Sequence, residues 1–140
     1  MSGSQQTRAL ARRYFDTLNA RDWDSFGALL ADDVVYEIPQ TGERITSRQR
    51  VVQFNQEYPG DWRLSVTRLI ADGETVAASM NVTDGDEAMV ALVYFEFRAD
   101  LIARVTDFWP ETYAPPPGRE HLVEHGLTGP DRFAGFLRVP

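Results

Sequence analysis

The second half of the chain alternates apolar and polar residues with a period of two, in four consecutive segments. These segments span residues 62–71, 74–83, 88–98 and 101–109, and only short turns separate them. A period of two is the repeat of a β-strand, and connections this short join antiparallel neighbours. The alternation therefore predicts four long antiparallel strands, which the first half of the chain must cover.

The first half of the chain has a helical period instead. Along residues 7–20, apolar side chains recur at the spacing of one helix face. Asp22 is a candidate N-cap for a second helix, which we expect to end near residues 31–32. A short strand over 34–38 follows, and Ser47 is a candidate N-cap for a third helix.

This order of elements predicts one α+β domain, in which a cone-shaped, curved antiparallel β-sheet wraps around three N-terminal helices as an α+β barrel. A bent sheet cannot press flat against helices everywhere, so we expect a cavity at its open end. With 140 residues, the chain has room for a single domain over 1–140. Its core is expected at about 7–112, with a C-terminal extension over 113–140.

Charge and composition argue against several classes of protein. The net charge of −7 disfavours nucleic acid and an anionic membrane surface as partners. All fourteen basic residues are arginine, a bias typical of a high-GC bacterial genome, and the lack of lysine removes Schiff-base chemistry. The lack of cysteine removes disulfides and a cysteine nucleophile. Without a signal-peptide-like or membrane-spanning run, we expect a cytoplasmic protein.

The strand over 88–98 separates two kinds of surface. Its odd positions are all apolar and should face the helices, while its even positions are mixed and lie on the back. The back still carries Val90, Leu92 and Tyr94, which is apolar for a surface exposed to water. We expect a second copy to cover it, giving a homodimer through the back face of the sheet. The alternative is scattered apolar residues on an ordinary surface.

The helix-facing residues of the other strands outline a cavity. The last strand contributes Val105, Asp107 and Trp109, and the first contributes Tyr36 and Ile38. Small residues in the sheet leave volume that larger side chains would fill. The expected pocket therefore has apolar walls, several aromatic rings and one carboxylate.

The layout resembles the nuclear-transport-factor-2-like superfamily, and within it the SnoaL-like branch, over about residues 7–112. The resemblance is carried by Tyr14-Phe15-x-x-Leu18-Asn19-x-x-Asp22-Trp23, by the run from Ala31 to Tyr36, and by Val105-Thr106-Asp107-Phe108-Trp109. It implies a cystatin-like pocket fold that houses isomerases, epoxide hydrolases, polyketide cyclases and non-catalytic binders. Function must therefore be argued from the site.

Three enzyme patterns of this superfamily can be compared with the residues. The ketosteroid-isomerase pattern matches at Tyr14 but has Ile38, before Pro39, where its carboxylate base belongs. The limonene-epoxide-hydrolase pattern matches at Tyr36 and Asp107, but Ile38 replaces its asparagine. The polyketide-cyclase pattern needs a single acid/base carboxylate, for which Asp107 is a candidate.

From these comparisons we predict a small-molecule pocket of the SnoaL-like type, in which Asp107 is the general acid/base and Tyr14 and Tyr36 orient a carbonyl. The predicted ligand-binding residues are Ile38, Met80, Val93, Phe95 and Trp109, with no cofactor and a small hydrophobic organic ligand as partner. Two other functions stay open: a non-catalytic binder of a hydrophobic metabolite, and a dimerisation module. Asp107 could also be a hydrogen-bonded structural residue, and the tyrosines could be core aromatics.

No metal site is predicted. His121 and His125 have helical spacing but lack the glutamate that would follow the first histidine in a zinc helix. Asp84 and Asp86 flank a hairpin tip that offers too few oxygens for calcium. We expect the tail to pack as a lid or along a dimer edge through its apolar residues, which are Leu122, Leu127, Phe133, Phe136 and Leu137.

Overall fold

A computed structural model describes residues 3–126 of the chain. Its helices are α1 (Gly3–Ala20), α2 (Trp23–Ala28) and α3 (Arg48–Glu57). Its strands are β1 (Leu30–Ile38), β2 (Glu43–Thr46), β3 (Trp62–Asp72), β4 (Thr75–Asp84), β5 (Glu87–Arg98) and β6 (Leu101–Phe108), and a 3₁₀ turn, η1, spans Glu120–Leu122. None of the helices within the described residues is long and apolar enough to cross a membrane.

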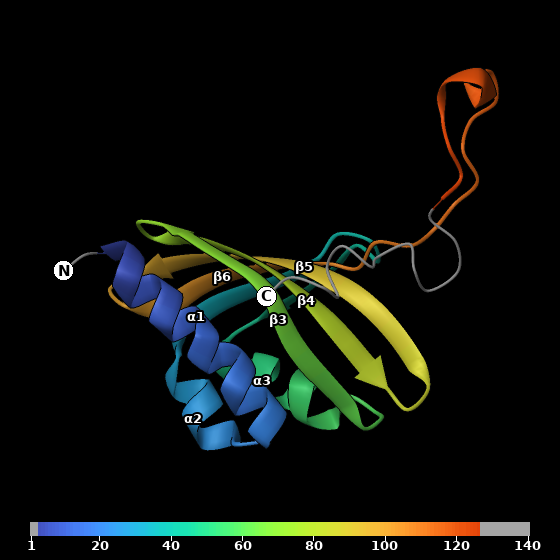
Figure 1. Ribbon diagram of the computed structural model, residues 1–140. Helices are drawn as coiled ribbons and strands as arrows, with labels where there is room; N and C mark the ends of the chain where they lie inside the picture. The colour runs from blue at the N-terminus through green and yellow to red at the C-terminus, as the bar shows by residue number, and fades with distance from the viewer. Residues whose placement is uncertain (1–2, 127–140) are drawn as a thin grey trace.

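The strands form one six-stranded sheet in the order β2-β1-β6-β5-β4-β3. Neighbouring strands are antiparallel except for β1 and β6, which are parallel. The long strands curve over the three helices, which lie on one side of the sheet (Figure 1). Register shifts interrupt the β1–β6, β3–β4 and β5–β6 pairs, and such irregularities bend a sheet. The predicted curved α+β fold is confirmed.

Two local boundaries differ from those expected. Helix α2 ends at Ala28, and the first strand begins already at Leu30, because β6 pairs with this segment and Ile102 N–H donates to the Leu29 carbonyl at 2.8 Å. Strand β2 was not expected, since its exposed residues show no apolar alternation. It is an edge strand, and an ion pair of 2.8 Å between Arg44 and Glu37 joins it to β1.

The core lies between α1, α2 and the concave face of the sheet. Phe15, Phe26 and Phe95 are fully buried there. The Tyr14 ring contacts all three, with a centroid separation of 4.8 Å from Phe95. Burying aromatic side chains of this size supplies much of the apolar stabilisation of a small domain.

The described part of the C-terminal extension is exposed and runs away from the sheet (Figure 1). Leu122 is 76% exposed, so this part of the chain does not pack as the expected lid. His121 and His125 are exposed on the same segment. The other apolar tail residues named above lie outside the described residues.

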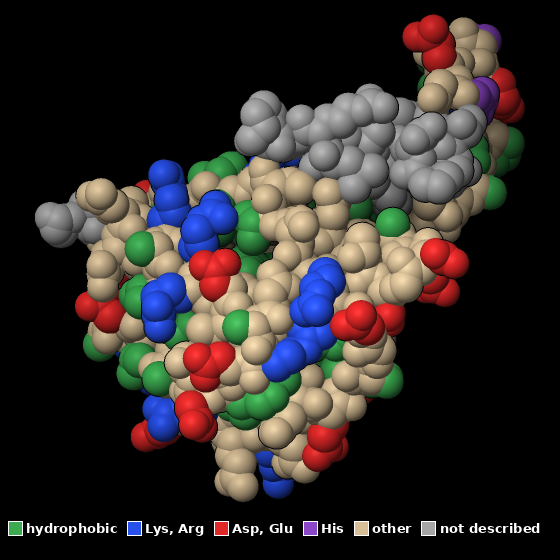
Figure 2. Space-filling view, turned by 60° about the horizontal axis from the view of Figure 1, so that its bottom comes forward, with side chains coloured by type: hydrophobic (Ala, Val, Ile, Leu, Met, Phe, Trp, Pro, Cys, Tyr) green, Lys and Arg blue, Asp and Glu red, His purple; other side chains and the backbone are tan. Residues whose placement is uncertain are grey.

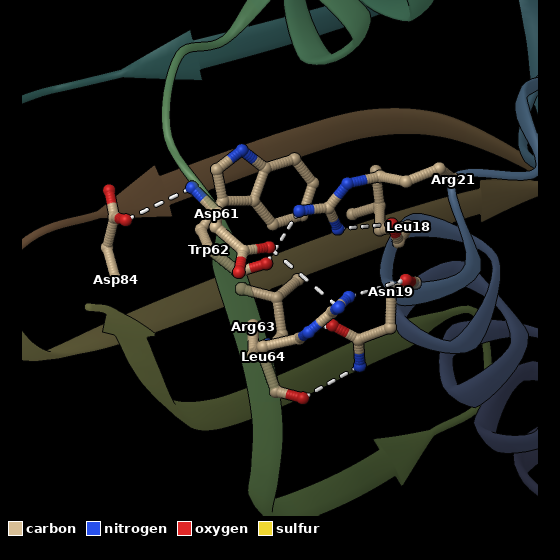
Figure 3. Close-up of polar contacts among 8 residues, drawn as sticks. All are labelled: Leu18, Asn19, Arg21, Asp61, Trp62, Arg63, Leu64 and Asp84. Carbon is tan, nitrogen blue, oxygen red and sulfur yellow. Dashed lines mark hydrogen bonds and ion pairs between the residues drawn. The ribbon is translucent and has the colours of Figure 1, made fainter.

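Helix α1 is fixed to the sheet at both of its ends. Near its N-terminus, the Ser4 hydroxyl accepts from Gly73 N–H at 2.8 Å, and the Thr7 hydroxyl donates to the Gly73 carbonyl at 2.7 Å. Near its C-terminus, the Asn19 amide donates to the carbonyl of Leu64 and accepts from its N–H, each at 2.8 Å (Figure 3). These contacts hold the helix across β3.

We expect Asn19→Ala to lower the free energy of unfolding by about 1–2 kcal/mol, because it removes both hydrogen bonds to Leu64. Urea denaturation measures the loss. Gln53→Ala, which removes one exposed side-chain hydrogen bond on α3, is the control and should change stability by less than about 0.5 kcal/mol. An equal effect of the two substitutions would show that the α1–β3 contact does not stabilise the fold.

Candidate functional site

A cavity of about 440 Å³ lies between α1, α3 and the sheet. Its volume is within the range of small-molecule sites. Of the residues predicted from the sequence, the structure brings seven together around it: Tyr14, Tyr36, Ile38, Met80, Val93, Asp107 and Trp109.

Strand pairing explains why Asp107 faces this cavity. In the antiparallel β5–β6 pair, Asp107 lies opposite Val93, whose side chain belongs to the buried face. In the parallel β1–β6 pair, Tyr36 lies opposite Val105, two residues before Asp107. The Tyr36 hydroxyl therefore reaches the carboxyl group and donates to its Oδ2. Within the described residues, Oδ1 is buried and accepts no hydrogen bond.

Burial raises the pKa of Asp107 from 3.8 to about 6. The cause is desolvation, which disfavours the charged form of a carboxyl group that is only 5% exposed. The hydrogen bond from Tyr36 lowers the pKa, and the nearby indole of Trp109 lowers it further. The polar groups of these two aromatic side chains thus oppose the effect of the apolar surroundings.

The two tyrosines remain protonated over the whole physiological range. Burial raises the pKa of Tyr14 well above 10, and the charge of Asp107 raises it further, while the Tyr36 hydroxyl opposes this shift. Burial also raises the pKa of Tyr36, again with the charge of Asp107 as the second cause. Asp107 is therefore the group of this trio that can exchange a proton near neutral pH.

The expected ligand contact of Phe95 needs correction. Phe95 does not line the cavity; it is 0% exposed and lies in the core, in contact with the Tyr14 and Phe15 rings. Alternation along β5 placed it on the correct face, but the period of a strand does not show how deeply a helix covers each position. Phe95 supports the wall formed by Tyr14.

Sequence reasoning missed much of the rim of the cavity. Helix α3 contributes Phe54 and Asn55, the residue after it contributes the Tyr58 ring, and the start of β3 contributes Trp62. Phe54, Asn55 and Tyr58 have the spacing of one side of a helix, but nothing local in the sequence shows that this side faces Tyr36. Turns and strand ends contribute the polar residues Gln40, Thr41, Glu43, Asp84 and Glu111.

The described residues contain no group of three His, Asp or Glu side chains that could hold a metal ion. The Asp84 carboxylate instead accepts from the Asp61 backbone N–H at 3.1 Å (Figure 3). It thereby ties the β4–β5 hairpin to the segment before β3.

The fold and the site define a small α+β pocket protein with one buried carboxyl group among aromatic side chains. The family model of the SnoaL-like domain matches residues 11–105. The chain therefore belongs to the SnoaL-like family, and its fold is that of the nuclear-transport-factor-2-like proteins. No protein of curated function matches it.

Several solved structures are similar. A Kribbella flavida protein assigned as a ketosteroid isomerase is 64% identical, with a TM-score of 0.84 over 89% of this chain and 93% of that one. A Xanthomonas campestris protein assigned as a polyketide cyclase is 26% identical, and its alignment covers 78% of this chain and 93% of that one with a TM-score of 0.67. A Burkholderia xenovorans protein of unknown function is 20% identical, with a TM-score of 0.73 over 86% and 95%, and shows the fold alone.

We expect Asp107→Asn to stabilise the protein at neutral pH. Because the folded state raises the pKa of this acid from 3.8 to about 6, wild-type stability falls as pH rises through that interval. Asparagine has no charge to bury, so the variant should be more stable than the wild type by about 3 kcal/mol above the interval and equally stable below it. Thermal unfolding of both proteins across this pH range tests this prediction. A stability difference between variant and wild type that does not change with pH would contradict it.

Proposed function

We propose that the protein binds a small, largely apolar carbonyl compound and that Asp107 transfers a proton next to the carbonyl group. One observation carries this proposal. In an apolar cup, the buried carboxyl group of Asp107 has one oxygen that accepts from Tyr36, one oxygen without a hydrogen-bond partner among the described residues, and a pKa of about 6. At neutral pH such a group is mostly ionised and can act as a general base.

The proposed step is a proton transfer through an enolate. Asp107 takes the proton from the carbon beside the carbonyl, and the electron pair of the broken C–H bond moves onto the carbonyl oxygen. The Tyr14 hydroxyl, which lines the same cavity, donates to that oxygen. In a substrate with a double bond one carbon beyond the acidic carbon, the negative charge extends to the far end of that bond. Asp107 then returns the proton to this far carbon, the double bond moves into conjugation with the re-formed carbonyl, and the isomerisation is complete. In an aldol ring closure, the enolate carbon instead attacks a second carbonyl, and the proton goes to the new alkoxide.

The relatives support this class of reaction. The 64% identical Kribbella flavida protein is assigned as a ketosteroid isomerase, and the Xanthomonas campestris protein as a polyketide cyclase. Both reaction types begin with proton removal beside a carbonyl group. In this chain Ile38 lines the cavity where the isomerase pattern has its base, so the proposal gives that role to Asp107 on β6.

A non-catalytic binder is the second candidate, and the Tyr36 hydroxyl favours it. This hydroxyl already donates to Asp107, so it cannot donate to a ligand carbonyl while Asp107 is ionised. A site with fewer free donors stabilises an enolate less well. The same apolar walls would hold a hydrophobic metabolite without transforming it.

We expect the wild-type protein to accelerate hydrogen–deuterium exchange at the acidic carbon of β-tetralone in D₂O, as measured by proton NMR. Asp107→Asn should reduce the enzyme-dependent rate by about 100-fold or more, because it removes the base. The wild-type rate should rise with pH through about 6 and then level off.

Asp16→Asn is the control, because this carboxylate lies on α1 but is exposed outside the cavity. It should leave the exchange rate unchanged. If β-tetralone quenches the pocket tryptophans but exchanges no faster than in buffer, the binder is the correct function. An Asp107→Asn variant that exchanges at the wild-type rate would contradict the role of Asp107.

We further propose that the protein is a cytoplasmic homodimer that associates through the back face of the sheet. Val90 is buried within the single chain, but Tyr94 is 49% and Ile70 62% exposed on this face. The rings of Tyr94 and Phe108 contact each other there, with 5.9 Å between their centroids. A second copy would remove this apolar surface from water.

We expect multi-angle light scattering to give a mass of two chains for the wild type and of one chain for Tyr94→Glu, because the substitution would bury a charge in the interface. Tyr113→Glu is the matched control, since Tyr113 is 83% exposed on the tail. A one-chain mass for the wild type would contradict the proposed dimer.

A further inference from the structure

The charged side chains of the cavity all have the same sign. The described residues that line it include four carboxylates and no basic side chain. Asp107 lies at the buried floor, while Glu43, Asp84 and Glu111 form the rim, where they reach solvent. The three rim carboxylates come from β2, from the end of β4 and from the segment after β6, so their common charge is not a feature of one loop.

The rim differs in this respect from the outer surface. On the face seen in Figure 2, acidic side chains lie close to arginines. Asp32, Asp33 and Glu37 form ion pairs with arginines at 2.9, 2.5 and 2.8 Å. In contrast, Glu43 accepts from a threonine hydroxyl at 2.6 Å, and Asp84 from a backbone N–H at 3.1 Å (Figure 3). Within the described residues, neither Glu43 nor Asp84 forms an ion pair with an arginine.

Aromatic rings connect the floor to this rim. The centroids of Tyr36 and Phe54 are 5.8 Å apart, and those of Phe54 and Tyr58 are 5.7 Å apart. The Trp62 ring already makes a cation–π contact within the protein, because the Arg21 guanidinium lies 3.5 Å from its ring centroid (Figure 3). Aromatic faces attract cations, and a tyrosine or tryptophan at the rim can do the same for a ligand.

The floor independently indicates a ligand. Asp107 lines the cavity, is 5% exposed, and has a buried Oδ1 with no hydrogen-bond partner among the described residues. Buried polar atoms normally have a partner, so a molecule in the cavity is expected to meet this one. An anionic molecule there would meet four like charges, and the repulsion is strong where water is excluded.

We propose that the pocket selects an amphipathic amine, with an apolar or aromatic body that fills the cup and one ammonium group held at the rim by Glu43, Asp84 and Glu111. The inference rests on the part of the proposed function that makes the cavity a ligand site, and it does not require proton transfer by Asp107. Anionic molecules of the same shape are rejected.

Three naphthalene probes of matched shape test the proposal by isothermal titration calorimetry: naphthylmethylamine, naphthylmethanol and naphthoate, each substituted at the same carbon. At about pH 8 and about 0.02 M salt, the amine should bind at least about tenfold more tightly than the alcohol, and naphthoate at least about tenfold more weakly. Raising the salt to about 0.5 M should reduce both differences, because the rim charges are exposed to screening.

The combined variant Glu43→Gln, Asp84→Asn and Glu111→Gln should bind the amine and the alcohol within about twofold of each other. The control variant carries Asp16→Asn, Asp72→Asn and Asp100→Asn, which remove three exposed carboxylates outside the cavity. It has the same net charge as the rim variant and should keep the wild-type preference. If the rim variant unfolds, the three single substitutions should each lower the preference in part.

The proposal is overturned if the wild type does not bind the amine, if naphthoate binds as tightly as the amine, or if the preference survives the rim substitutions. Its failure is separable from that of the proposed reaction. If the protein prefers the amine but does not accelerate exchange of β-tetralone, the proposed proton transfer is wrong and the amine selectivity stands. If it accelerates the exchange but binds the three probes equally, the amine selectivity is wrong and the proton transfer stands.

Discussion

The burial of one carboxyl group is the constraint on which the site depends. Removing a carboxylate from water is costly, and the Tyr36 hydroxyl and the Trp109 indole offset only part of the cost for Asp107. The remaining cost raises the pKa of Asp107 to about 6, so its two protonation states are equally populated at that pH. An exposed aspartate reaches this balance only in more acidic solution. Parallel pairing of β1 with β6 makes this possible, because it sets Tyr36 opposite Val105 and within reach of the carboxyl group.

The rest of the molecule holds the walls of this site in place. Helix α1 is attached to the β3–β4 turn through Ser4 and Thr7 at one end and to β3 through Asn19 at the other. Between these attachments it places Tyr14 over the cavity, and Phe95 supports the ring from the core. Side chains held by such packing give a site its geometry before any ligand arrives.

The sequence predicts the strands and the buried carboxyl group because both follow from a local repeat. Alternation along β5 and β6 assigns Val93 and Asp107 to the concave face without knowledge of any other element. It does not predict β2, which has no apolar period and forms only because β1 offers it an edge. The sequence does not predict the rim either, because Phe54, Trp62 and Asp84 come together only through the curvature of the whole sheet. The alternation also predicts the correct face of the sheet for Phe95. It does not show that other side chains cover Phe95 completely and so separate it from the cavity.

The floor of the cup is built on strands and helix α1, whereas much of its rim is built on turns and strand ends. Gln40 and Thr41 lie in the β1–β2 turn, and Asp84 ends β4, while Tyr36 and Asp107 lie within paired strands. Turns accept substitutions and insertions that would disrupt a strand ladder. Descendants of this protein can therefore diverge in the molecules they admit while inheriting the same buried carboxyl group, and an engineer can exchange the rim without rebuilding the scaffold.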